Sequence, residues 1–456
     1  MEQLKTAMGL LSRRKTMLLG AAALAMQGLA GSHVAAQESG GGLGTADSPV
    51  QLRIIADAAY GNAWQQVMVP KFNEKYPHIK VTIDPVPYTE LLAKAMLDAT
   101  ASTPTYDILV LDDPWTPQVA QTGALVDLRK ETAQWTNEGY DWDDFNAAPL
   151  AATQWKGVQY GVPMRSNMLL MFVNKTLYKK AGLPVPTPDL TWKEYLEQAP
   201  KLVQDTNGDG VVDAWAIGTY FKRDPLTPTI WQSILNSEGG RLLDNAGKPA
   251  FNDEIGVKAL ETHVELLKYA PPGAISHGYS EALAAFRQGQ VATSFMWGSV
   301  YRNSAVDPKT TTLTPEQVGL QVLPVGAKMG GSNRGIASGT IHAKSKKKEA
   351  AWAFLQWFSS KEGELYHVNN LGGFPARKST LATKPNADNE WMTPVFAALQ
   401  QGFDVIEAGE MWRVRHPKSD AVQQALADAV ASAISGQASA KAALDDAARR
   451  AERALR

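Results

Sequence analysis

The chain has 456 residues, no cysteine and a formal net charge of −1 at pH 7. This length is enough for two or three domains, and a hydrophobic fraction of 44% can fill a sizeable core. A net charge near zero gives no sign of a nucleic-acid or other polyanionic partner. Because no disulfide can form, the fold has to be held together by that core.

Residues 1–36 have the pattern of a cleaved secretory signal peptide. The basic stretch Arg13–Lys15 precedes a short apolar run, and Val34–Ala36 fits the small-x-small rule, so we expect cleavage after Ala36 and a periplasmic protein. Ser12–Arg14 also resembles a twin-arginine signal, but Thr16 stands where phenylalanine is usual, so the Sec and twin-arginine routes both stay open. Without cysteine there is no acceptor for a lipid anchor at the cleavage site.

Strand and helix patterns alternate after residues 37–49, a Gly/Ser-rich stretch that predicts a flexible leader. Segments of helical spacing separate three apolar runs, which predict strands at 50–57, 79–86 and 106–113. Such alternation is typical of a parallel α/β sheet. Ligands bind beyond the carboxyl ends of the strands of such sheets, which selects residues 57–60 and 112–115 as candidate site segments.

The second part of the chain begins with "YGVPMRSNMLLMFVNKTLY" (160–178), in which a polar step precedes an apolar strand. A helix then follows, because Thr191 and Glu194 fit a capping box and Leu190 with Tyr195 fits a hydrophobic staple. Further strands are predicted at "VATSFMW" and "VGLQVLPVG". Amphipathic helices are predicted at "KKKEAAWAFLQWFSS" and over much of 420–455.

The stretch "DTNGDGVVDAWAIG" (205–218) is similar to a calcium-binding loop. Gly210 takes the sixth position, where such loops turn sharply, but Ala216 takes the twelfth, where a bidentate glutamate is usual. A structural calcium and a metal-free turn therefore both stay open. The candidate metal ligands are Asp205, Asn207, Asp209, Val211 through its carbonyl, and Asp213. No other cofactor is expected.

Many segments, in order, resemble the sugar-type extracellular solute-binding proteins of bacterial ABC importers, the maltose-binding-protein-like group. The resemblance extends from Pro49 to Leu455. The segments that carry it are "VPKFNEKYPHIKVTI", "YDILVLDDPWTPQVAQTGALVDL", "YGVPMRSNMLLMFVNKTLYKKAGL", "TWKEYLEQAPKL", "LNSEGGRLLD", "AFRQGQVATSFMWGS", "VGLQVLPVG", "AAWAFLQWFSS", "GGFPARKS" and "SGQASAKAALDDA".

The resemblance implies a two-lobed periplasmic binding protein fold, a clam-shell of two discontinuous α/β lobes joined by hinge crossings. It implies a first lobe of 50–166 with 323–373 and a second lobe of 167–322 with 374–456. The crossings would lie near Arg165–Met168, Leu320–Pro324 and Gly372–Pro375. It further implies a monomer that captures a saccharide or polyol between the lobes, closes, and delivers the ligand to a membrane permease.

Sugar recognition needs planar polar groups that bond paired hydroxyls, and aromatic faces that stack on the ring. Candidates stand where the resemblance places cleft loops. They are Asp57, Tyr60, Asp112, Asp113, Trp115, Arg165, Asn167, Trp231, Trp297, Asn333, Arg334, Trp412 and Arg413. Helix capping is the alternative for Asp57 and for one aspartate of the 112–113 pair. The alternatives are an interlobe structural contact for Arg165 and a core position for Trp231.

Two other functions are weighed against ligand capture. A secreted carbohydrate-active enzyme would need two opposed carboxylates, but Asp112 and Asp113 are adjacent, and no Gly-x-Ser-x-Gly or His-Glu-x-x-His motif is present. A calcium-dependent structural or adhesive module would depend on the 205–216 loop alone. We therefore expect a binding protein rather than an enzyme.

Overall fold

The computed structural model describes residues 42–327, 334–405 and 413–456, all of which belong to one compact unit, 39–456. The predicted signal peptide lies outside the described residues. The described part of the predicted leader, 42–49, turns back on itself, since the N–H of Ser48 donates to the carbonyl of Thr45. Within the described ranges, no helix combines the length and the apolar character needed to cross a membrane.

The first lobe is built on a sheet in the order β2, β1, β3, β10 and β6. The first three strands are parallel, and β10 runs antiparallel between β3 and β6. The predicted strands at 50–57 and 79–86 are confirmed to the residue. The strand bounds are β1 Val50–Asp57, β2 Ile79–Val86, β3 Ile108–Asp112, β10 Arg334–Ile341 and β6 Gly161–Asn174.

Apolar residues of this sheet face helices on both sides, as the continuous apolar runs predict. Ile54 packs with Phe72 and Trp352 in one core, whereas its neighbour Ile55 packs with Leu91 in the other, because successive side chains of a strand point to opposite faces. The helices are α1 Ala58–Ala63, α2 Val69–Lys75, α3 Tyr88–Thr100, α4 Thr116–Ala120, α5 Leu128–Glu131, α6 Ala147–Ala152, α12 Lys348–Phe358, α13 Lys361–Leu371 and α14 Lys378–Leu381. A short hairpin, β4 Gln154–Trp155 with β5 Val158–Gln159, precedes β6.

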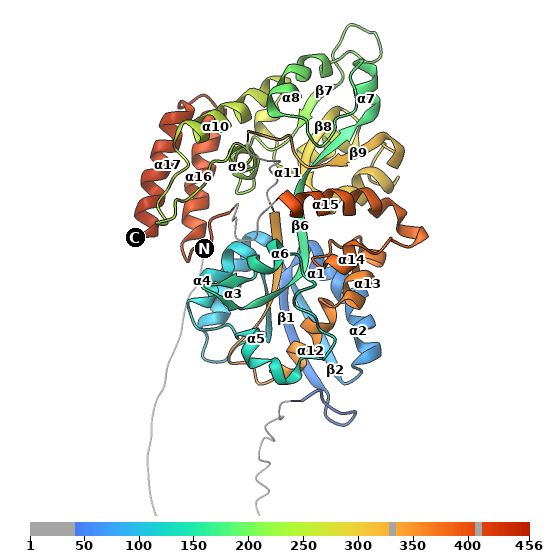
Figure 1. Ribbon diagram of the computed structural model, residues 1–456, viewed down its shortest axis with the longest axis vertical. Coiled ribbons are helices and arrows are strands. Elements are labelled where there is room, and N and C mark those ends of the chain that lie inside the picture. The colour runs from blue at the N-terminus through green and yellow to red at the C-terminus, as the bar shows by residue number, and fades with distance from the viewer. Residues whose placement is uncertain (1–41, 328–333, 406–412) are drawn as a thin grey trace, which may run out of the picture. The chain divides into compact units, whose positions relative to one another are not determined.

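Strand β6 belongs to both lobes, and Figure 1 shows it running from one to the other. Its first part pairs with β10 as far as Met168, which lies opposite Arg334. Its second part pairs with β8 from Leu169, which lies opposite Trp297, and with β9 on the other side. The same strand therefore changes partners between two consecutive residues.

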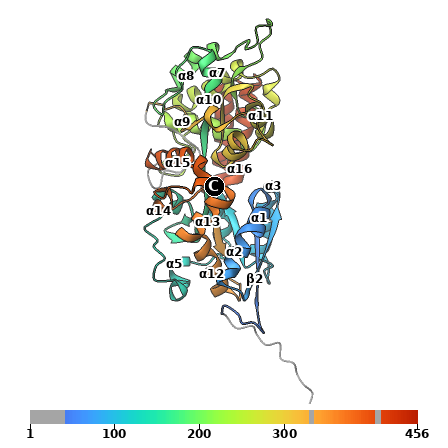
Figure 2. The same ribbon diagram turned by 90° about the vertical axis from the view of Figure 1, so that its right-hand side faces the viewer.

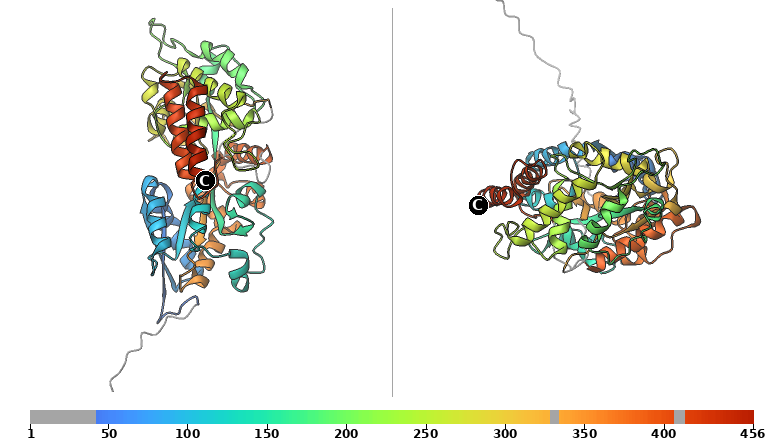
Figure 3. Two further views of the ribbon diagram at one scale, coloured as in Figure 1. Left: turned by 90° about the vertical axis from the view of Figure 1, so that its left-hand side faces the viewer. Right: turned by 90° about the horizontal axis from the view of Figure 1, so that it is seen from above.

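The second lobe is built on the second half of β6 with β8 Val291–Trp297, β7 Trp215–Gly218 and β9 Val318–Gln321. The predicted capping box is present, because the N–H of Glu194 donates to Thr191 Oγ1 and the N–H of Thr191 donates to Glu194 Oε2. Figure 2 shows helices gathered around each sheet. Those of this lobe are α7 Lys175–Lys180, α8 Trp192–Gln198, α9 Pro228–Ser237, α10 Glu254–Leu266, α11 Tyr279–Arg287, α15 Thr393–Val405, α16 Ser419–Ile434 and α17 Ala440–Leu455. The last two pack side by side, in red in Figure 3.

The chain still contacts the first lobe just after Gly372–Pro375, where the sequence predicts a crossing. The carbonyl of Ala376 accepts from the N–H of Asn146, and the N–H of Lys378 donates to Asp144. Arg377 is buried, and its Nη1 donates to the Asp144 carboxylate at 3.2 Å. Residues 376–379 therefore lie with the first lobe, because the buried Arg377 has its partners there, whereas Phe374 packs in the core of the second lobe.

Candidate ligand-binding cleft

A cavity of about 360 Å³ lies at the carboxyl ends of β1, β3 and β8 and is lined by residues of both lobes. This volume is within the range of small-molecule sites. The cavity brings together eight of the thirteen residues predicted from the sequence. They are Asp57, Tyr60, Asp112, Trp115, Arg165, Asn167, Trp297 and Arg413.

Asp57 ends β1 and caps α1, since its Oδ1 accepts from the N–H of Ala59 at 3.0 Å. The capping alternative is thus present, and the same side chain lines the cavity. Burial raises the pKa of Asp57 above its ordinary value, and the cap and Arg165 oppose that shift. Tyr60 stands one turn further on and packs on Trp64 with 4.4 Å between ring centroids.

Asp112 ends β3 and Asp113 follows it, and one arginine after α15 in the chain binds both. Arg413 donates from Nη1 to Asp112 Oδ2 at 2.6 Å and from Nη2 to Asp112 Oδ1 at 2.8 Å, so the ion pair is bidentate. The same Nη2 also donates to Asp113. The hydroxyl of Tyr88 also donates to Asp112 Oδ2, at 2.7 Å.

Asp113 lies behind the cavity wall rather than in it. It is buried, and its Oδ1 accepts from the N–H of Ile336 at 3.0 Å, which ties β3 to β10. Burial raises its pKa, against the influence of Arg413. Arg334 is also buried, and burial lowers its pKa to about 10, with Asp113 opposing that shift. Arg334 thus stabilises the charged form of Asp113 without lining the cavity.

Asn167 and Trp297 come from two strands that meet at the lobe junction. Asn167 donates from Nδ2 to Ser299 Oγ at 3.1 Å, so part of its amide already serves as a brace. Trp297 is 9% exposed at the end of β8. A β-carbon built on Gly335 would lie 3.5 Å from the Trp297 ring and 3.5 Å from Arg413 Nη2. The bare backbone of Gly335 therefore leaves space between an aromatic face and a cation.

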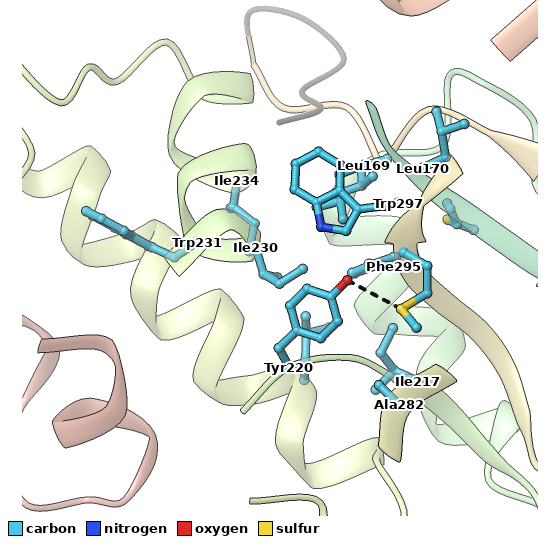
Figure 4. Packing of buried hydrophobic residues seen from close by; sticks show 14 of the residues in the cluster. Leu169, Leu170, Ile217, Tyr220, Ile230, Trp231, Ile234, Ala282, Phe295 and Trp297 are labelled. Carbon is cyan, nitrogen blue, oxygen red and sulfur yellow. Dashed lines mark hydrogen bonds between the residues drawn. The ribbon is translucent and has the colours of Figure 1, made fainter. Parts of the chain in front are cut away.

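Trp231 is placed in the core of the second lobe, away from the cavity. It is fully buried, its Nε1 donates to the carbonyl of Gly256 at 3.1 Å, and it packs edge-on to Phe251. Figure 4 shows it on the far side of Ile230 from Trp297. The core alternative is the one that the structure supports. Asn333 and Trp412 lie outside the described residues.

Several cavity residues escaped sequence reasoning, notably Tyr88, Leu226, Tyr279 and Ser299. A signal existed for Tyr88, which follows β2 by two residues. The rule that selects the ends of β1 and β3 applies equally to that strand. No comparable signal marks Leu226 or Tyr279, because only the folded second lobe brings them to the cleft.

The calcium-like loop lies in the second lobe and is held by hydrogen bonds from its own backbone. Asp205 Oδ1 accepts from the N–H of Gly208 at 2.7 Å, and its Oδ2 accepts from the N–H of Gly210 at 2.7 Å. Asp213 accepts from both the N–H and the hydroxyl of Thr206. No group of three or more His, Cys, Asp or Glu with metal-site geometry occurs in the described part of the chain. The donors present fit an Asx-type turn.

The model of the bacterial extracellular solute-binding protein family matches residues 56–365, more than half of the chain. The chain belongs to this family. The resemblance inferred from the sequence segments and the two-lobed α/β fold predicted from it are both confirmed. The family consists of binding proteins, so the prediction that the chain is not an enzyme is confirmed as well.

Two curated relatives differ in what their names say they bind. A probable amino-acid ABC transporter periplasmic-binding protein of Sinorhizobium fredii is 26% identical over 81% of this chain and 82% of its own length. The mannitol-binding protein of Pseudomonas aeruginosa is 27% identical over 55% of this chain and 60% of its own length. The names alone therefore do not fix one ligand class.

Solved structures agree on the fold. An ABC transporter solute-binding protein of Agrobacterium radiobacter in complex with ribitol has a TM-score of 0.72 and 28% identity, covering 89% of this chain and 98% of that one. Maltose-bound MalE3 of T. maritima has a TM-score of 0.73 at 22% identity, covering 88% of this chain and 99% of that one. The second likeness concerns the fold alone.

Proposed function

We propose that the protein captures a saccharide or related polyol in the cleft and delivers it to the membrane permease of an ABC importer. One observation carries the proposal. A single cavity combines aromatic faces, Trp115 and Trp297, with carboxylate, amide and guanidinium groups. Aromatic rings stack on the apolar face of a sugar, and the planar polar groups bond its hydroxyls. Bound ribitol in a 28% identical structure supports the same ligand class.

The lobes contribute different groups to this cavity. Asp57, Tyr60 and Asp112 come from the strand ends of the first lobe, whereas Tyr279 and Trp297 come from the second. A ligand that touches both sets stabilises the closed arrangement, because only there do all contacts form together. Closure is then the signal that a permease can recognise.

We propose that the protein reaches the periplasm through a cleaved signal peptide and acts there as a monomer. The pattern of residues 1–36 supports export, and family membership supports an extracytoplasmic place of action.

A thermal-shift screen tests the proposal. Mono-, di- and oligosaccharides, polyols and amino acids are each added to the purified protein, and a ligand that binds the native state alone raises its Tm. We expect a rise with at least one saccharide or polyol. A rise with amino acids and with no saccharide or polyol would overturn the proposed ligand class. It would indicate an amino-acid ligand instead, as in the name of the Sinorhizobium relative. Release of new reducing ends from a bound oligosaccharide would instead support an enzyme.

A further inference from the structure

Arg165 differs from the other cleft arginines in what its guanidinium contacts. It projects from the first half of β6 and lines the cavity, with the Tyr60 ring centroid 5.5 Å from its central carbon. Among the described residues, no carboxylate lies within ion-pair distance of it, and no acceptor takes a hydrogen bond from its guanidinium. Arg165 is therefore a cation that lines the cavity and whose guanidinium donates to no acceptor in the described part of the chain.

The groups that surround Arg165 include one carboxylate, Asp57, which attracts the cation without forming an ion pair with it. Its electrostatic neighbours are Tyr60, Tyr279, Asp57 and His367. Burial keeps both phenols and the imidazole neutral, since it raises the tyrosine pKa values and lowers the pKa of His367 to about 3. Asp57 is the one carboxylate among these four, and its Oδ1 is engaged by the N–H of Ala59.

The remaining charges of the cleft are already matched. Arg413 binds both Asp112 and Asp113, and Arg334 lies close enough to Asp113 to stabilise its charge. These two arginines and two aspartates cancel formally. Arg415, a further cation near Asp113, donates to the carbonyls of Ala151 and Gln154 and does not line the cavity. A half-buried cation without an ion-pair partner is less stable than one that has a partner. Arg165 thus stands out as a group whose partner arrives with the ligand.

We propose that the ligand carries a carboxylate, as in an aldonate or a uronate, and that Arg165 binds it. The inference rests on the proposed capture of a saccharide or polyol and narrows it to acidic members of that class. The guanidinium fork matches the two oxygens of a carboxylate and forms charge-assisted hydrogen bonds with them. Tyr60 and Tyr279 also line the cavity and offer neutral hydroxyl donors, and Trp297 remains available for the carbon skeleton.

Isothermal titration with matched ligand pairs tests the inference. The pairs are sorbitol and gluconate, mannitol and mannonate, and galactose and galacturonate, in which one terminal carbon is either neutral or oxidised to a carboxylate. We expect the acid of at least one pair to bind at least about tenfold more tightly than its neutral partner. If no acid binds more tightly than its partner, the inference is overturned. The proposed function is judged separately by the thermal-shift screen, in which any saccharide or polyol, neutral or acidic, can raise the Tm.

Variants of Arg165 connect the preference to this side chain. Arg165→Met should abolish the preference for the acid, whereas Arg165→Lys should keep part of it because the charge remains without the fork. Arg129→Met is the matched control, since Arg129 is exposed on α5 and lies over the Trp142 ring, outside the cavity. It should leave the preference unchanged. A preference that survives in Arg165→Met would refute the assignment.

A second readout separates ligand recognition from a structural role. Arg165→Met removes an unpaired cation, so the Tm of the ligand-free protein should stay the same or rise. An interlobe structural arginine would behave in the opposite way. A lower Tm in Arg165→Met, together with an unchanged preference between the paired ligands, would assign Arg165 to the structural role.

Discussion

Replacing Arg413 by methionine should destabilise the protein far more than the loss of an ordinary surface ion pair. The substitution removes three charge-assisted hydrogen bonds and leaves two carboxylates, Asp112 and Asp113, without their shared cation. The Asp113 and Arg413 side chains are only 4% and 12% exposed. Breaking one side of such a buried pair costs about 3–5 kcal/mol. Water reaching Asp112 through the cleft lowers the cost, so we expect about 3 kcal/mol.

Urea unfolding measures this free energy from the midpoint and the slope. Arg223→Met is the control, because Arg223 pairs with Asp428 while its side chain is 62% exposed. The control should lose no more than about 1 kcal/mol. Adding Asp113→Asn to Arg413→Met should recover at least about 1 kcal/mol, since a neutral amide is cheaper to bury than an unpaired carboxylate. A loss below about 1 kcal/mol in Arg413→Met would refute the reasoning.

Three further predictions concern the cleft, an imidazole and the calcium-like loop. Gly335→Leu should weaken binding of the screened ligand at least about tenfold, because the leucine side chain enters the space beside Trp297. Gly335→Ala should change the affinity little, since its β-carbon meets its neighbours at 3.5 Å, an ordinary contact distance. Equal affinities of the two variants in a titration would contradict this geometry. His367 accepts a hydrogen bond from Trp64 Nε1 at 3.0 Å and has a pKa lowered to about 3 by burial, so the unfolded chain binds the extra proton and stability falls as pH drops below about 6.5. His367→Gln should make the urea-derived stability between pH 6.5 and 4.5 less dependent on pH by about one proton, and an unchanged slope would show that this imidazole is not the titrating group. Calorimetry with millimolar calcium after chelation should give no heat from the loop at 205–213 if its carboxylates stay with their own backbone donors; a binding heat that is lost in Asp205→Ala would establish a calcium site.

The strands of the first lobe were predictable because their signal is local. Apolar runs such as 50–57 bury residues on both faces of the sheet, so Ile54 and Ile55 both reach a core. The capping box at Thr191 and Glu194 is equally local, since it needs residues only three positions apart. These features follow from short stretches of sequence.

The cleft could be predicted only in part, because it is assembled from distant segments. Asp57 and Asp112 follow strands and were found from the rule for parallel sheets. Tyr279 begins a helix of the second lobe and carries no local mark of a site. Trp231 was predicted as a site residue but lies in the core. The sequence pattern of an amphipathic helix does not distinguish an aromatic residue that faces a core from one that faces a ligand. The bond to Gly256 that settles its place is visible only after folding.

The lobe boundary near residue 375 could not be predicted to the residue, because it depends on the buried Arg377. Arg377 is buried and bonded to the carbonyls of Ser359 and Asp141 as well as to Asp144. Arginine in a short connection between two helices normally indicates a solvent-exposed link. Only the presence of three acceptors in the first lobe makes its burial favourable, and those acceptors come from two separate parts of the chain.

The position of β10 has a consequence for how the polypeptide assembles during synthesis. β10 lies between β3 and β6 and bonds to both, yet it is made from residues 334–341, after nearly all of the second lobe's sheet. Until that stretch leaves the ribosome, β3 and the first half of β6 have no strand between them, and their open edges can pair wrongly. Assembly of the first lobe therefore waits for a late segment and depends on contacts of long sequence separation, which fold slowly. The second lobe is also completed late, because its helices α15, α16 and α17 are made last, so neither lobe can finish folding from one continuous stretch of the chain.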